Sequence, residues 1–127
     1  MNKYQVNIKE SSSNLTARDR IKYKDTSIAI SLDEATFEAE VIIDVKDYIV
    51  LDIHNEKNEE RPDYLLMELI DRSGKVYKTS SEIFMNSFLD IYNEMESEDL
   101  LEELVIKVLR VPSKNFKGKD FLKPVLV

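Results

Sequence analysis

The second half of this chain contains a fixed order of apolar segments, and that order limits the folds available to it. Five segments have the length and the β-branched or aromatic content of strands, at residues 48–54, 63–71, 75–79, 103–111 and 120–127. Between the third and the fourth, residues 81–95 carry apolar side chains at helical spacing, namely Phe84, Phe88, Ile91, Tyr92 and Met95. The chain is therefore expected to be mainly β, with one amphipathic helix between the third and fourth strands.

Local signals support these boundaries. The segment Asp71–Gly74 predicts a hairpin turn, because glycine readily supplies the positive φ that such turns need. Thr79 and Glu82 have capping-box spacing, which predicts Thr79 as the N-cap of the helix. Alternation places Ile49, Leu51 and Ile53 on one face of the first strand. The apolar stripe of the helix would then close the bottom of a small barrel.

Five strands with one helix between the third and fourth is the order of an OB-fold, a partly open barrel that binds oligonucleotides and oligosaccharides. We expect a five-stranded OB-fold-like domain over residues 31–127. Residues 1–30 would form a basic N-terminal extension that contains an edge strand at 4–9. The extension would add a strand, embrace a second subunit, or contribute Arg18, Arg20 and Lys22 to a nucleic-acid path.

Composition excludes several classes of protein. A length of 127 residues fits one domain, and the absence of cysteine excludes disulfides and thiolate metal sites. The single histidine, His54, is expected at the surface, and no nucleophile elbow, P-loop or metal-ligand spacing is present. No apolar run reaches the roughly 18 residues of a membrane span, and the N-terminus does not resemble a signal peptide. We expect a cytoplasmic protein that is not an enzyme and needs no cofactor or membrane.

The net charge of −7 conceals an uneven distribution. Residues 1–30 contain six basic and three acidic side chains, and residues 105–127 contain six basic and one acidic. The intervening residues 31–104 contain six basic and 21 acidic side chains. Because the local field decides where a polyanion binds, the acidic total does not exclude a nucleic-acid partner.

The candidate binding residues combine cations with aromatic rings on the last three predicted strands and the turn between the final two. Cations attract phosphates, and aromatic faces stack on bases with little regard to sequence. The turn joining the fourth and fifth strands is one of the two loops with which an OB-fold contacts its ligand. The candidates are Lys75, Tyr77, Lys78, Arg110, Lys114, Asn115, Phe116, Lys117 and Lys119.

Four runs of the chain resemble small single-stranded DNA-binding proteins of bacteriophages and mobile elements. They are TARDRIKYKDTSIAISLDEAT (16–36), IVLDIHNEKNE (49–59), KVYKTSSEIFMNSFLDIYNEM (75–95) and VPSKNFKGKDFLKP (111–124). The resemblance implies that Tyr77, Lys78, Lys114, Asn115, Phe116 and Lys119 face the ligand. The sequence departs from many such proteins in ending with VLV rather than with an acidic tail.

Two main hypotheses about function follow from the sequence. The first is a non-enzymatic single-stranded DNA-binding protein that supports replication or recombination of a phage or mobile element, as a monomer, a homodimer or a higher oligomer. The second is a protein-binding module that uses the acidic residues 31–104 to imitate DNA or to inhibit a host enzyme. Acids gathered on one face would favour the second, whereas acids outside and bases in one groove would favour the first.

Overall fold

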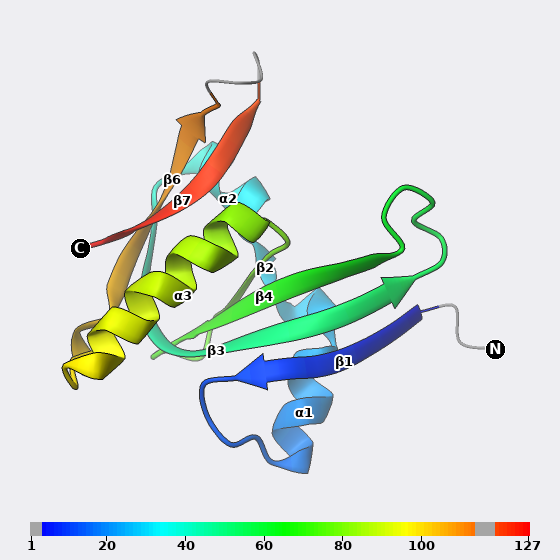
Figure 1. Cartoon of the computed structure of the whole chain (residues 1–127), viewed down its shortest axis with the longest axis horizontal. Coiled ribbons are helices and arrows are strands. Elements are labelled where there is room, and N and C mark those ends of the chain that lie inside the picture. The colour runs from blue at the N-terminus through cyan, green and yellow to red at the C-terminus, as the bar shows by residue number, and fades with distance from the viewer. Residues whose placement is uncertain (1–3, 114–118) are drawn as a thin grey trace.

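The longest strand organises the fold in the computed structural model, which describes residues 4–113 and 119–127 (Figure 1). β3 (Val41–Asn55) pairs along one edge with β4 (Asp63–Asp71). Along its other edge, its first residues pair with β6 (Val105–Pro112) and its later residues pair with β1 (Tyr4–Ser11). Because β3 changes partner along its length, the sheet curls into an open half-barrel.

The remaining elements complete a seven-stranded sheet with the order β2-β5-β4-β3-β6-β7, to which β1 adds at β3. They are α1 (Ala17–Lys24), η1 (Thr26–Ile28), β2 (Ile30–Ser31), α2 (Leu32–Glu38), β5 (Val76–Thr79), α3 (Glu82–Ser97), η2 (Leu101–Glu103) and β7 (Asp120–Leu126). Within the described residues, no helix combines the length and the apolar character needed to cross a membrane.

The mainly β prediction is confirmed, and so is the helix between the strands now labelled β5 and β6. The sheet has seven strands rather than five, because β1 and β2 join it. The first predicted strand is also longer than expected, since β3 begins at Val41. β2 pairs in parallel with the outer edge of β5. Within the described residues, β7 pairs only with β6, so the sheet stays open between β5 and β7.

The concave side of the curled sheet holds the larger core, and α3 fills it. Phe84, Met85, Phe88 and Tyr92 are buried along one side of the helix, as the helical spacing predicts. The predicted N-cap is wrong, because the helix begins two residues later than a cap at Thr79 requires. Ser81 is the N-cap instead, and its hydroxyl accepts a hydrogen bond of 3.2 Å from the backbone N–H of Phe84.

A second core lies on the opposite face of the sheet, under the N-terminal residues. Ile49, Leu51 and Ile53 are buried there, together with residues of β4 and with Ala29. The predicted edge strand is present as β1, which is antiparallel to β3. The N-terminal residues therefore add a strand and also cover a sheet face that would otherwise expose apolar side chains to water.

Candidate functional site

A groove of about 650 Å³ lies between β7 and the β4–β5 part of the sheet. Asn58 and Arg61 line it from the β3–β4 connection, and Tyr64 lines it from β4. Lys78 on β5 and Phe121 on β7 lie on its other sides. In Figure 1, β6 and β7 turn away from the hairpin of β3 and β4.

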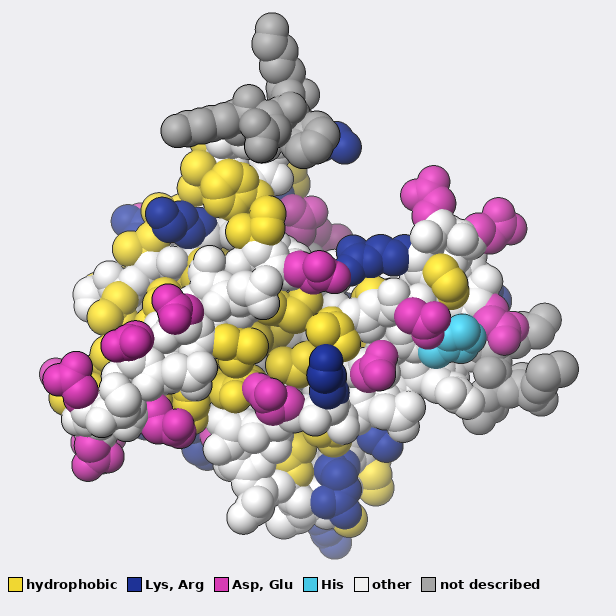
Figure 2. Space-filling view, viewed as in Figure 1, with side chains coloured by type: hydrophobic (Ala, Val, Ile, Leu, Met, Phe, Trp, Pro, Cys, Tyr) yellow, Lys and Arg dark blue, Asp and Glu magenta, His cyan; other side chains and the backbone are white. Residues whose placement is uncertain are grey.

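Hydrogen bonds in the β3–β4 connection hold Arg61 at the groove. The backbone N–H of Asn55 donates to the carbonyl oxygen of Pro62 at 2.7 Å, which closes the connection. The side-chain oxygen of Asn58 accepts a bond of 3.1 Å from the backbone N–H of Arg61. The Arg61 guanidinium then reaches Glu82, at the start of α3, with a distance of 2.8 Å between Nη2 and Oε1. Figure 2 shows basic and acidic side chains side by side on this part of the surface.

Lys78 lies at the boundary between the groove and the second core. Its Nζ donates to the carbonyl oxygen of Thr26 at 2.9 Å. On the neighbouring strand, Glu68 pairs in register with Lys78. The carboxyl group of Glu68 is fully buried, and neither oxygen has a hydrogen-bond partner among the residues that the structure describes. Burial raises the pKa of Glu68 to about 8, against the opposing charge of Lys78, so this carboxyl is protonated at neutral pH.

Arg110 on β6 is held by two carboxylates. Its Nη2 donates to the side chain and the backbone oxygen of Asp33, and its Nη1 lies 3.3 Å from Oδ2 of Asp120. The guanidinium carbon lies 3.5 Å from the centre of the Phe37 ring. Asp33 and Asp120 also line the groove. The charge of Arg110 is therefore already compensated, and a phosphate would have to displace a carboxylate to reach it.

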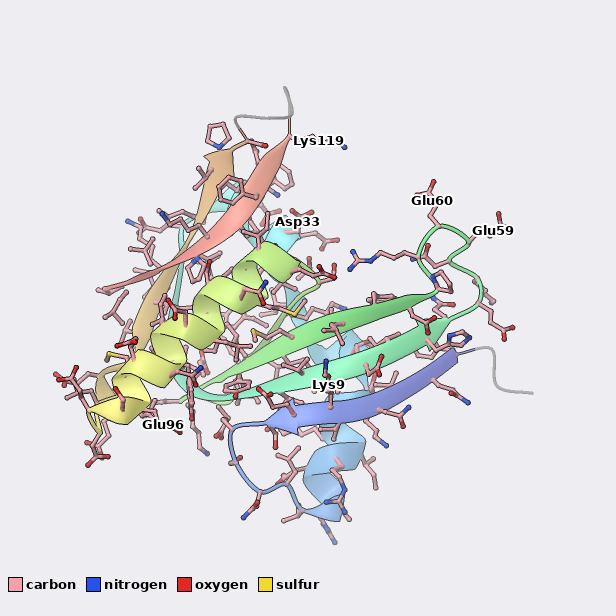
Figure 3. All side chains as sticks on the ribbon, viewed as in Figure 1. Lys9, Asp33, Glu59, Glu60, Glu96 and Lys119 are labelled. Atoms are coloured by element: carbon pink, nitrogen blue, oxygen red, sulfur yellow. The ribbon has the colours of Figure 1, made fainter. Side chains whose placement is uncertain are left out.

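The remaining predicted site residues are dispersed. Lys75 is exposed immediately before β5, after the turn in which Gly74 has a φ of 96°. Tyr77 is half-buried against the core that contains α3. Lys119 is exposed immediately before β7 (Figure 3). Of the predicted residues that the structure describes, only Lys78 lines the groove, and Arg110 contacts Asp33 and Asp120, which also line it. Lys114, Asn115, Phe116 and Lys117 lie outside the described residues.

The ends of the predicted basic hairpin are described even though its tip is not. The backbone N–H of Ser113 donates to the carbonyl oxygen of Lys119 at 2.9 Å. The next residue, Asp120, lines the groove. The connection between β6 and β7 therefore starts and ends at the edge of the groove.

Sequence reasoning missed Arg61 and Tyr64 as groove residues. Both follow the charged β3–β4 connection, and Tyr64 stands at the start of a strand with its side chain on the face opposite Leu65. Burial is the main factor that raises the pKa of the Tyr64 phenol, which remains protonated and able to donate a hydrogen bond. In the sequence, the feature that could have indicated Tyr64 is an aromatic residue placed directly after a long polar connection between two strands.

Acidic side chains are spread over the outer surface rather than gathered on one face. Figure 3 shows Glu59 and Glu60 at the tip of the β3–β4 connection and Glu96 near the end of α3, at opposite ends of the molecule. His54 lies near the first of these ends, with Nδ1 2.6 Å from Oδ1 of Asp63. This hydrogen bond is the largest factor that raises the pKa of His54.

The groove therefore offers hydroxyl, amide, cationic and aromatic groups to a ligand, together with the carboxylates of Asp33 and Asp120. In residues 4–113 and 119–127, no group of three or more histidine, aspartate or glutamate side chains is arranged to hold a metal ion. No family model, no curated protein and no solved structure matches this chain.

Proposed function

We propose that this protein binds single-stranded DNA without enzymatic activity, and that the groove between β7 and β4–β5 is the binding site. The position of the groove carries the proposal. An OB-fold binds oligonucleotides on the face of its second and third strands, between the loop joining strands one and two and the loop joining strands four and five. With β3 taken as the first strand, the two strands are β4 and β5 and the first loop is the β3–β4 connection, all of which line this groove. The second loop corresponds to the β6–β7 connection, and the strand that follows it lines the groove through Asp120 and Phe121.

The proposed topology is that of an OB-fold modified at one edge. The strands β3 to β7 with α3 between β5 and β6 have the order of that fold, and β3 pairs with both β4 and β6. OB-folds are partly open barrels. In this protein β2 occupies the edge of β5 that is not paired with β4.

The chemistry of the groove suits a single strand. Tyr64 and Phe121 are half-exposed aromatic residues on opposite sides, and unpaired bases stack on such rings. Lys78 supplies positive charge for phosphates, and Arg61 would add to it if a phosphate displaced Glu82 from its guanidinium. The sequence-predicted cations of the β6–β7 connection, Lys114 and Lys117, would extend this path. Arg110 is assigned to holding the groove wall, since Asp33 and Asp120 already bind it.

The acidic protein-binding hypothesis receives less support. An imitation of DNA needs carboxylates aligned on one surface, whereas Glu59 and Glu96 lie at opposite ends of the molecule. Dispersed acids of this kind usually keep a small domain soluble. The proposed role in replication or recombination of a phage or mobile element rests on the sequence resemblance, as does self-association.

The first test is titration of a fluorescent oligo-dT of about 30 nucleotides, long enough for at least one OB-fold site. The anisotropy should rise steeply at low salt and the affinity should fall as salt is added, because phosphate neutralisation releases counterions. A duplex of equal length should bind much more weakly. Absence of binding to the single strand at low salt would contradict the proposal.

Lys78→Met should weaken oligo-dT binding and lower the slope of log affinity against log salt by about 0.7, the value for one phosphate contact on a single strand. The substitution keeps the aliphatic stem and leaves the neighbouring Glu68 in its neutral form. Lys9→Met is the matched control, since Lys9 lies on β1 and does not line the groove (Figure 3). Equal slopes for the two variants would remove Lys78 from the binding path.

A further inference from the structure

Among the residues that the structure describes, Phe37 is the most exposed aromatic side chain. It lies on α2, and 70% of its surface is accessible to solvent. Its ring nevertheless has a fixed partner, because the guanidinium carbon of Arg110 lies 3.5 Å from the ring centre. One face of the ring is covered by Arg110, and the large accessible fraction requires that the other face is open.

The partner of this ring is itself rigidly held. The Arg110 side chain is only 17% exposed, and it is bound by Asp33 from α2 and by Asp120 from β7. The ring and the guanidinium plane are therefore ordered before any ligand arrives. A ligand that stacks on the open face of Phe37 would not have to order these groups, which lowers the entropic cost of binding.

Folding alone does not explain a phenylalanine at this position. A ring that remains 70% exposed contributes little burial energy, and an exposed cation–π contact adds only a small stabilisation. Arg110 would keep both carboxylate partners if residue 37 were smaller, since Asp33 and Asp120 hold the guanidinium without the ring. Phe37 does not itself line the groove, but Asp33 and Asp120 both do, and they connect the groove to Arg110 and thereby to the ring.

We propose that the open face of Phe37 is a stacking platform for one nucleobase of a strand that leaves the groove. This inference rests on the proposed function and adds to it a contact on α2, outside the five strands and the connections that predict the groove. The local charge favours a base over a phosphate at this point. Arg110 carries one positive charge against the two negative charges of Asp33 and Asp120, so this end of the groove favours an uncharged base, and the phosphates of the strand are assigned to the Lys78 side.

The test compares oligo-dT with an abasic oligomer of equal length and charge, bound to wild-type protein and to Phe37→Leu. Leucine keeps an apolar side chain but removes the aromatic face. The variant should bind oligo-dT about 5- to 150-fold more weakly, the range that corresponds to one stacked base. Its affinity for the abasic oligomer should match the wild-type value, and Phe37→Trp should retain the affinity for oligo-dT.

Ile21→Ala is the matched control, because Ile21 is an apolar residue on α1 with a similar exposure of 74%. It should change neither affinity. Equal affinity of wild-type and Phe37→Leu for oligo-dT would overturn the platform while leaving the groove proposal in place. An equal loss on both oligomers would also overturn it, because the side chain would then act through the fold. If the wild-type protein does not bind oligo-dT, the proposed function fails, and this inference fails with it.

Photo-cross-linking provides a direct readout. A strand that carries 5-iodouracil should form a covalent adduct with Phe37, because the halogenated base reacts with an aromatic ring stacked on it. Mass spectrometry of the digested complex would locate the adduct. An adduct confined to other residues would place the base elsewhere.

Discussion

Glu68→Met is expected to increase the free energy of unfolding at pH 8 to 9 and to remove most of the pH dependence of stability between about pH 5 and pH 8. The Glu68 carboxyl is fully buried in the second core, and both of its oxygens lack hydrogen-bond partners in the described structure. A buried polar group without partners is destabilising, and its replacement by an apolar side chain of similar shape is often favourable. Methionine has a similar length and no charge.

The direction of the pH effect follows from the pKa of Glu68, which burial raises from 4.5 to about 8. Between these values the folded protein holds a proton on this carboxyl and the unfolded chain does not. The pH-dependent contribution of Glu68 to the free energy of unfolding is therefore fully present below about pH 4.5, and it is lost as the pH rises toward 8. Each unit of pKa difference corresponds to about 1.4 kcal/mol, so the total change amounts to several kcal/mol.

The charged neighbours of Glu68 modify this effect without cancelling it. Lys78, in register on β5, favours the ionised carboxylate, whereas Asp25 between α1 and η1 opposes it. The amine of Lys78 donates to the backbone oxygen of Thr26 rather than to the carboxylate. Tyr23 of α1 faces the same region, and the charge of Glu68 is one of the minor factors that raise the pKa of its phenol.

Urea unfolding at a series of pH values from 5 to 9 measures the effect. The wild-type free energy of unfolding should fall across this range relative to that of Glu68→Met. Glu59→Met is the control, since Glu59 is exposed at the tip of the β3–β4 connection and should leave the wild-type profile unchanged (Figure 3). Parallel profiles for the wild-type protein and Glu68→Met would contradict a protonated Glu68.

The period of two along the strands predicted the two faces of the sheet correctly, but not what covers them. Ile49, Leu51 and Ile53 do share a face, as expected from alternation. That face is buried because residues 15–29 fold across it. A contact between segments so far apart in the sequence depends on tertiary packing and leaves no periodic signal. For the same reason, the sequence did not reveal that Glu68 is buried.

The N-cap of α3 was predicted wrongly because several neighbouring residues can form an N-cap. Thr79, Ser80 and Ser81 are all capable N-cap residues. Thr79 ends β5 and its side-chain oxygen accepts a bond from the backbone N–H of Ser81, so the helix begins after Ser81. The spacing to Glu82 favoured Thr79 as the N-cap, but β5 extends through Thr79, and the N-cap is therefore Ser81.

Part of the candidate site was predictable from the sequence, but the ion pairing of Arg110 was not, and that difference has a physical cause. The sequence identified Lys78 and the edge of the β6–β7 connection, because both follow from the strand order. It also identified Arg110 as a basic side chain on a strand. The carboxylate of Asp33 that compensates Arg110 comes from a residue 77 positions away, so no local pattern shows the pairing. Charge counted along a sequence therefore overstates the charge that a ligand meets.

Phe88→Ala is expected to lower the free energy of unfolding by about 3–5 kcal/mol, the usual cost of removing a buried phenylalanine ring. Phe88 is fully buried at the centre of the α3 face. Its ring lies edge-on to Tyr48 of β3 at 5.8 Å and parallel to Phe84 at 6.4 Å between centroids. Removal of this ring would leave a cavity between the helix and the curled sheet.

The chain offers a matched control in Phe37→Ala, which removes the same atoms from an exposed ring. That variant should lose about 1 kcal/mol or less, the contribution of an exposed cation–π contact with Arg110. Urea unfolding of both variants at one pH measures the difference. Equal destabilisation would mean that α3 does not anchor the fold as its burial indicates. A large loss at Phe88 with a small one at Phe37 would leave Phe37 available for binding, because its ring would then contribute little to folding.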